Sequence, residues 1–144
     1  MVNILLDTCV ISELRKPNGN LMVRDTIASI HTDHLFMSVI TIGEITKGIV
    51  LLQDEDRKKQ LADWLDVIEQ GYASRILPID HAIARIWGEM TALARNAGKT
   101  LSVSDGLIAA TAYHHGMHLM TRNISDFLCT GILLINPWEG STVC

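Results

Sequence analysis

The chain has 144 residues, of which 48% are apolar and 19% are charged. This composition predicts one globular domain over residues 1–144 and excludes an intrinsically disordered chain. No apolar run approaches the roughly 20 residues of a membrane span, and Asp7 interrupts the N-terminal apolar run too early for a signal peptide. We therefore expect no contact with a membrane and a location in the cytoplasm.

The balance of charges is acidic, with 16 acidic and 12 basic residues and a net charge of −4. This charge argues against a protein that binds nucleic acid through a broad basic surface. Two bound divalent cations would neutralise it. Cys9, Cys129 and Cys144 are odd in number and widely spaced, so they suggest neither a disulfide framework nor a thiolate zinc site.

Apolar periodicity predicts short strands that alternate with helices. We expect strands over residues 4–6, 35–38, 76–77, 117–121 and 132–135. Helices are expected after Asp7, over residues 21–30, from Thr41, from Asp54 to Gly71, from Asp80 to Gly98 and from Ser102 to His115. The alternation predicts an α/β fold of three layers, α/β/α, around a mainly parallel sheet of about five strands.

An acidic residue ends the first predicted strand. Asp7 follows Ile4-Leu5-Leu6 and precedes Val10 and Ile11 at helical spacing, so its carboxylate lies where a strand leads into a helix. Ligands bind at this edge of open α/β sheets. An alternative is that Asp7 only caps the following helix.

Three further acids, Glu44, Asp105 and Asp126, fall at similar places. Each also has a structural explanation: Thr41 with Glu44 and Ser102 with Asp105 have the capping-box spacing, and Asp126 suits a turn. Two carboxylates about 4 Å apart repel by roughly 4 kcal/mol at an effective dielectric constant near 20, so acids gathered at one edge need a cation. Oxygen ligands select Mg²⁺ or Mn²⁺, which can polarise a phosphodiester and lower the pKa of a water molecule.

Five segments follow one another in the order and spacing of a known family. They are Leu5-Leu6-Asp7-Thr8, Glu44-Ile45 with Gly48, the run from Asp105 to Ala112, Thr121-Arg122-Asn123 with Asp126-Phe127, and Asn136-Pro137-Trp138. Together they resemble the PIN-domain ribonucleases, and most closely the VapC-type toxins of bacterial toxin–antitoxin pairs, including the FitB-like branch.

The resemblance implies a PIN-like fold and a metal-dependent endoribonuclease that hydrolyses RNA phosphodiester bonds. The implied catalytic and metal-binding acids are Asp7, Glu44 and Asp105, with Mg²⁺ or Mn²⁺ as the cofactor. Relatives differ in whether the position of Asn123 or that of Asp126 carries the fourth acid. Here we expect Asp126 to serve, directly or through water, with Asn123 as a neutral ligand or positioning group. Thr8 is expected to support the acids, and Lys47 and Arg122 are expected to contact phosphate. Cys9 departs from the Asn or Ser that relatives carry after the Asp-Thr pair.

The resemblance also implies the partners. A cognate antitoxin would insert a segment into the acidic cleft, RNA would be the substrate, and a homodimer would be the working unit. DNA would be reached only indirectly, through the antitoxin. The apolar run from Ile49 to Leu52 fits an interface or plain core.

Other classes of function fit the sequence less well. A catalytically silent partner-binding module is the main alternative. A phosphatase with an aspartyl nucleophile would need a second Asp where the chain has Cys9. The charge of Asp7 would raise the pKa of the Cys9 thiol, which disfavours thiol catalysis. In His114-His115-x-x-His118 the adjacent histidines of a helix do not face each other, which disfavours a zinc site.

Overall fold

The computed structural model describes residues 2–139 and 141–143. Its sheet contains strands β1 Ile4–Leu6, β2 Leu35–Ser38, β3 Ile76–Leu77, β4 His118–Met120, β5 Leu134–Asn136 and β6 Ser141–Val143. Their order is β3-β2-β1-β4-β5-β6, and the first five strands are parallel. The mainly parallel sheet is therefore confirmed. The sixth strand, β6, was not expected and pairs antiparallel with β5.

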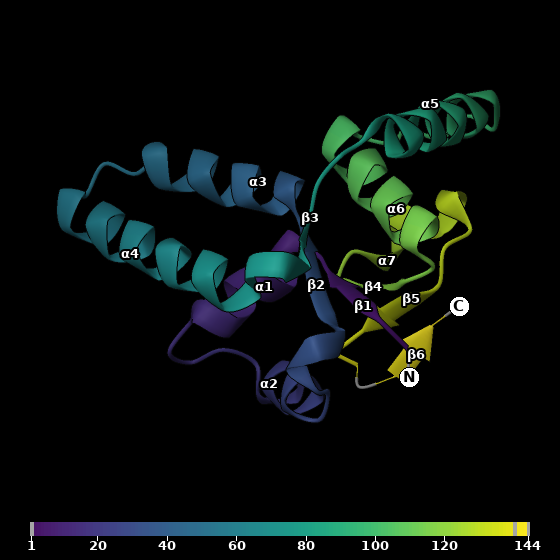
Figure 1. Cartoon of the computed structure of the whole chain (residues 1–144). Coiled ribbons are helices and arrows are strands. Elements are labelled where there is room, and N and C mark those ends of the chain that lie inside the picture. The colour runs from purple at the N-terminus through teal and green to yellow at the C-terminus, as the bar shows by residue number, and fades with distance from the viewer. Residues whose placement is uncertain (1, 140, 144) are drawn as a thin grey trace.

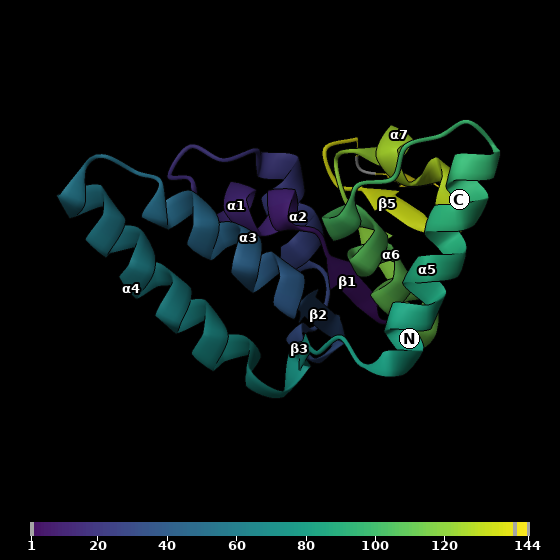
Figure 2. The same cartoon turned by 90° about the horizontal axis from the view of Figure 1, so that it is seen from above.

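The helices are α1 Thr8–Arg15, α2 Leu21–Ala28, α3 Val39–Val50, α4 Glu55–Tyr72, α5 His81–Asn96, α6 Val103–His115 and α7 Ile124–Phe127. Short 3₁₀ turns span Thr32–His34, Ala73–Arg75 and Leu128–Thr130. Figures 1 and 2 show α3 and α4 as a hairpin on one side of the sheet, with α5 and α6 on the other side. Within the described part of the chain, no helix combines the length and apolarity needed to cross a membrane.

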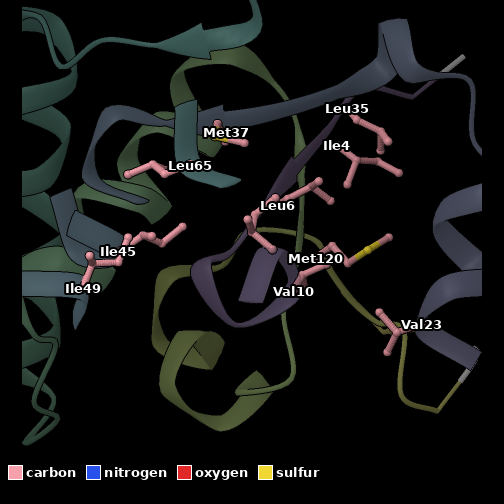
Figure 3. Packing of buried hydrophobic residues seen from close by; sticks show 11 residues of the cluster. Ile4, Leu6, Val10, Val23, Leu35, Met37, Ile45, Ile49, Leu65 and Met120 are labelled. Atoms are coloured by element: carbon pink, nitrogen blue, oxygen red, sulfur yellow. The ribbon is translucent and has the colours of Figure 1, made fainter. Parts of the chain in front are cut away.

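Successive residues of the strands point to opposite faces of the sheet and build two cores. Ile4 and Leu6 pack with residues of α1, α2, α3 and α4, whereas Leu5 packs with residues of α6 and with Phe127 of α7. Figure 3 shows the first core, in which Leu6 lies near Val10. Because both faces are covered, strands need apolar residues at every position, which explains the uninterrupted run in β1. The three-layer arrangement is confirmed.

Several helix boundaries differ from the expectations: α2 ends at Ala28 rather than at residue 30, α5 ends at Asn96 before Gly98, and α3 and α4 differ as follows. The hydroxyl oxygen of Ser38 accepts the N–H of Ile40 (3.0 Å), so α3 begins at Val39 rather than at Thr41. The prediction that Thr41 and Glu44 form a capping box is therefore wrong, because Thr41 lies inside α3 and Glu44 lies in its second turn. Helix α4 also continues through Gly71 to Tyr72.

The contact between α5 and α6 depends on one glycine. A Cβ atom at Gly106 would lie 2.8 Å from Cδ1 and 2.9 Å from Nε1 of Trp87, which is closer than side-chain carbons pack. Gly106 thus lets the first turn of α6, which carries Asp105, lie directly against the indole of Trp87.

We predict that Gly106→Ala destabilises the protein by about 1–3 kcal/mol, because the new methyl group overpacks this contact. Gly88→Ala in α5 is the matched control, since its Cβ would meet nothing within 4 Å. We expect that substitution to stabilise the protein by about 0.5–1 kcal/mol through the lower backbone entropy of the unfolded chain. Urea unfolding of both variants measures the difference, and equal stability of the two would contradict the close α5–α6 contact.

Candidate active site

The candidate site lies at the carboxyl edge of the sheet, where the strand order reverses. Strand β1 lies between β2 and β4, and the chain adds β2 and β3 on one side before it crosses to β4 on the other. Such a switch point is where open α/β sheets bind ligands. Asp7 follows β1 at this point, and its N–H donates to the carbonyl of Met120 in β4 (2.9 Å).

Asp7 is held by donors from two elements. Its carboxylate accepts the N–H of Thr8 at Oδ1 (2.8 Å) and the hydroxyl of Thr121 at Oδ2 (2.8 Å), and only 5% of the residue is exposed. Asp7 does cap α1, as the structural alternative supposed. The cap alone does not explain the second bond, which fixes the carboxylate against the end of β4.

Thr121 is the residue that sequence reasoning left without a role. It is fully buried directly after β4, and besides donating to Asp7 its hydroxyl oxygen accepts the N–H of Asn123 (3.0 Å). Thr121 therefore couples Asp7 to the loop that carries Asn123 and Asp126. The sequence does contain a signal for this role. A Thr directly after a predicted strand often accepts the N–H of the residue two positions later, and so starts a turn.

A second pair of threonines reaches Glu44. The hydroxyl of Thr8 donates to Oε1 of Glu44 (2.7 Å) and lies 3.1 Å from the hydroxyl of the buried Thr41. The carboxylate of Glu44 thus points toward the first turn of α1, beside Asp7, rather than back to a helix cap. Glu44 is itself exposed to solvent.

The remaining acids lie on the α6 and α7 side of the edge. Asp105 is half-buried in the first turn of α6, and its N–H donates to the hydroxyl of the N-cap residue Ser102 (3.2 Å). Asp126 lies in α7, and Asn123 is the N-cap residue of that helix without a side-chain capping bond. Both Asn123 and Asp126 are exposed.

The acids act on one another electrostatically. Burial raises the pKa of Asp7 most, the bonds from Thr121 and Thr8 oppose that rise, and the charges of Asp105 and Glu44 add to it. Burial likewise raises the pKa of Asp105, with Ser102 opposing and the charges of Asp126 and Glu44 adding. The four predicted acids therefore form one negative region, and a cation bound there would be attracted to all of them.

The described residues contain no group of three or more His, Cys, Asp or Glu side chains close enough to hold one metal ion. This finding also disfavours zinc at His114, His115 and His118. It is compatible with Mg²⁺, which keeps several water molecules and uses one or two protein carboxylates. The oxygen-only chemistry of the acids and their mutual repulsion fit such an ion.

The two predicted phosphate contacts differ in their surroundings. Lys47 is exposed and lines a hollow of about 440 Å³ together with Glu44 and Ser104, so its charge lies beside the acids. Arg122 is also exposed, and its guanidinium lies over the ring of Trp138, 5.2 Å from the ring centre. Stacking holds Arg122 in one place at the side of the site.

Cys9 is an unsuitable nucleophile. Its sulfur lies 3.8 Å from Oδ2 of Asp7 and 3.7 Å from the hydroxyl oxygen of Thr121. Burial first, and then the charge of Asp7, raise the pKa of the thiol, so the reactive thiolate is disfavoured. Cys9 and Cys129 are free thiols, and Cys144 lies outside the described residues.

A second hollow, of about 250 Å³, lies between α1, α3 and α4, and we call it the α4 hollow. Thr8 and Glu44 border it on the side of the acids, and Arg15 and Arg57 also line it. Its apolar wall comprises Ile45, Ile49, Leu52, Leu61 and Trp64. Leu61 and Trp64 of α4 pack against the first core and also face this hollow, whereas Leu65 is buried in that core.

The PIN domain family model matches residues 4–127 of the chain. Toxin FitB of Neisseria gonorrhoeae and VapC ribonuclease Y4jK of Sinorhizobium fredii are each 36% identical to it. Each alignment covers 94% of this chain, with 99% of FitB and 98% of Y4jK.

Solved structures agree. The crystal structure of FitAcB from Neisseria gonorrhoeae superposes with a TM-score of 0.89 over 94% of this chain and 99% of that chain. The structure of FitAB bound to an IR36 DNA fragment gives a TM-score of 0.88, with 94% and 95% covered. Both are 36% identical in sequence.

The match of the family model over residues 4–127 and the agreement with the solved structures place the chain in the PIN-domain class. The chain belongs to the PIN-domain family and, within it, to the group that contains FitB and the VapC ribonucleases.

We predict that Asp105→Asn makes the metal-free protein more stable at neutral pH. The raised pKa of Asp105 means that ionisation destabilises the folded state relative to the unfolded state. This loss of folding free energy is fully present at pH values above the raised pKa of Asp105. It shrinks as the pH falls from that pKa to the ordinary value of 3.8, and it is absent below pH 3.8. Thermal unfolding with chelator at neutral and acidic pH measures the gain.

Asp66→Asn, which removes the same charge from an exposed position on α4, is the matched control. Its stability should stay within about 0.5 kcal/mol of the unmodified chain at all pH values. A gain from Asp105→Asn that persisted below pH 3.8 would contradict the electrostatic origin.

Proposed function

We propose that this protein is a metal-dependent endoribonuclease, a toxin that hydrolyses RNA phosphodiester bonds with Asp7, Glu44, Asp105 and Asp126 as its acids. The observation that carries the proposal is the bonded arrangement around Asp7: Thr121 fixes its carboxylate, Thr8 bridges to Glu44, and burial, together with the charge of Asp105, raises its pKa. An arrangement that costs stability at neutral pH is typical of a functional site.

The acids would hold Mg²⁺ or Mn²⁺, with Asn123 as a neutral ligand. When bound, such an ion polarises the phosphodiester and lowers the pKa of the attacking water. The side chains of this chain supply position and charge: Thr121 and the N–H of Thr8 donate to Asp7 and favour its ionised form against the effect of burial. Thr8 holds Glu44 toward the same point, and Lys47 and Arg122 supply positive charge for the phosphates.

The relatives support this proposal. Y4jK, which is named a VapC ribonuclease, and FitB, which is named a toxin, align over nearly the whole of this chain. The match of the PIN domain family model to residues 4–127 spans every residue to which we assign a role.

The central prediction concerns RNA cleavage. Incubated with total RNA and Mg²⁺ or Mn²⁺, the antitoxin-free protein should produce discrete fragments, and chelator should abolish them. Asp7→Asn, Glu44→Gln and Asp105→Asn should each lower the cleavage rate by at least about 100-fold, because each removes a charge that the metal and the transition state need. Gel electrophoresis with end-labelled RNA measures the rate.

Asp66→Asn again serves as the control and should cleave at the unmodified rate. Millimolar Mg²⁺ or Mn²⁺ should also raise the melting temperature, since an ion at 100 times its Kd stabilises the native state by about 2.7 kcal/mol. Folded, metal-stabilised protein that leaves every RNA uncut would contradict the nuclease and favour a partner-binding module.

We also propose that a cognate antitoxin restrains the toxin by occupying the α4 hollow. The hollow combines an apolar wall with two arginines and reaches Glu44, so a bound segment could block the acids. Solved relatives include toxin–antitoxin complexes, one of them FitAB bound to DNA. Given the net charge of −4, we infer that DNA is contacted only through the antitoxin.

The homodimer remains a proposal from the family. The residues of the apolar run from Ile49 to Leu52 have different surroundings. Ile49 is buried, Val50 and Leu51 are 64% and 66% exposed, and Leu52 lines the α4 hollow. Val50 and Leu51 are therefore the part of the run that is free to meet a second copy.

Leu51 and Leu52 are neighbours in the chain with different surroundings, and they provide a matched test. Leu52→Glu should prevent inhibition by the co-expressed antitoxin while RNA cleavage continues, because it places a charge on the apolar wall of the α4 hollow. Leu51→Glu should leave inhibition intact and weaken only the dimer. Cleavage assays with and without antitoxin, together with light scattering, measure both effects. Full inhibition of the Leu52→Glu protein would exclude the α4 hollow as the antitoxin site.

A further inference from the structure

A third hollow adjoins the acids on the side of α7. It has a volume of about 460 Å³, and its lining comprises Lys99, Thr100, Ser125, Asp126, Leu128 and Cys129; we call it the Lys99 hollow. The hollow is thus lined by the acid Asp126, the cation Lys99 and two hydroxyl residues, Thr100 and Ser125. The proposed function has no role for Lys99, Thr100 or Ser125.

The backbone of Lys99 is fixed by the end of α5. Gly98 has a positive φ of 74°, its N–H donates to the carbonyl of Arg95 (3.0 Å), and the N–H of Lys99 donates to the carbonyl of Ala94 (2.8 Å). These two bonds form the Schellman motif that ends a helix. The side chain of Lys99 therefore starts from a defined position at the mouth of the hollow.

The ammonium group of Lys99 takes part in none of the four ion pairs found among the described residues. Although Asp126 lines the same hollow, no ion pair joins the two side chains within 4.0 Å. The positive charge thus stands beside the acids without being neutralised by them, where a phosphate group could meet it.

A neighbouring hollow of about 250 Å³ extends this positive charge along α5. Lys99 lines it together with Arg95 and Thr91. Beside another of the acids, Lys47 lines the hollow that also contains Glu44. Cations therefore lie next to two of the acids, Asp126 and Glu44, which suits a strand that runs across the edge of the sheet.

We propose that the Lys99 hollow binds a backbone phosphate of single-stranded RNA next to the phosphate that is cut, and that the strand continues toward Arg95. This inference rests on the proposed nuclease function. No aromatic side chain lines the hollows of Lys99, Arg95 or Lys47, so nothing there can stack on a base. The contact is therefore with the backbone, and its contribution to binding does not depend on base sequence.

A simpler role for both cations would be structural. Lys99 and Arg95 lie at the C-terminal end of α5, where positive charge interacts favourably with the helix dipole. That role predicts a loss of stability on substitution but no effect on RNA binding. The two roles can therefore be separated by measuring stability and the salt dependence of binding on the same variants.

The test measures binding of a fluorescein-labelled oligouridine by the full chain carrying Asp105→Asn, which prevents cleavage. Fluorescence anisotropy over a range of salt concentrations gives the slope of log K against log [salt]. Adding Lys99→Gln should reduce the magnitude of this slope by about 0.7, the value for one phosphate contact with a single strand. Lys99→Arg should restore it.

Lys59→Gln is the matched control, since it removes the same charge from exposed α4 and leaves the slope unchanged. A Lys99→Gln slope equal to that of the control, with or without a loss of stability, overturns the phosphate site, and so does failure to bind oligouridine by a chain that cleaves RNA. In both cases the nuclease function stands. Absence of both RNA cleavage and RNA binding in the unmodified chain overturns the proposed function together with this inference.

Discussion

The hydrogen bond from Thr121 to Asp7 is the interaction on which the candidate site depends. It joins residues 114 positions apart and exists only because β1 and β4 are neighbours in the sheet. Around it, burial and the charges of Asp105 and Glu44 raise the pKa of Asp7, so the folded protein holds a carboxylate in surroundings that oppose its ionisation. A cation at this edge would relieve that cost, as the proposed metal dependence requires.

Threonine hydroxyls organise the acids in this protein. Thr8, Thr41 and Thr121 come from α1, α3 and the end of β4, and their bonds connect Asp7 and Glu44 across three elements. A hydroxyl can both donate and accept, so Thr121 holds Asp7 with its proton and the N–H of Asn123 with its oxygen. Neutral groups of this kind orient carboxylates without cancelling the negative charge that attracts a cation.

The distribution of charge explains how an acidic protein could handle RNA. The chain has a net charge of −4, but it does not need a broad basic surface, because individual basic side chains line the hollows that border the acids. They are Arg15 and Arg57 in the α4 hollow, Lys47 beside Glu44, and Lys99 beside Asp126. Overall charge therefore misleads about the partner, whereas the local pairing of acids and cations is consistent with a phosphate backbone.

The sequence by itself determined the class of fold and the positions of the acids. The strands over residues 35–38 and 76–77, the burial of Ile4-Leu5-Leu6, and the caps at Asp54, Asp80 and Ser102 follow from patterns within a few residues of each other. Only the tertiary structure decided that β6 closes the edge beside β5, that Trp64 faces a hollow, and that Thr121 holds Asp7. The physical reason is range: caps and apolar alternation are set by neighbours in the chain, whereas strand order and side-chain bonds between distant strand ends are set by the packing of the whole sheet.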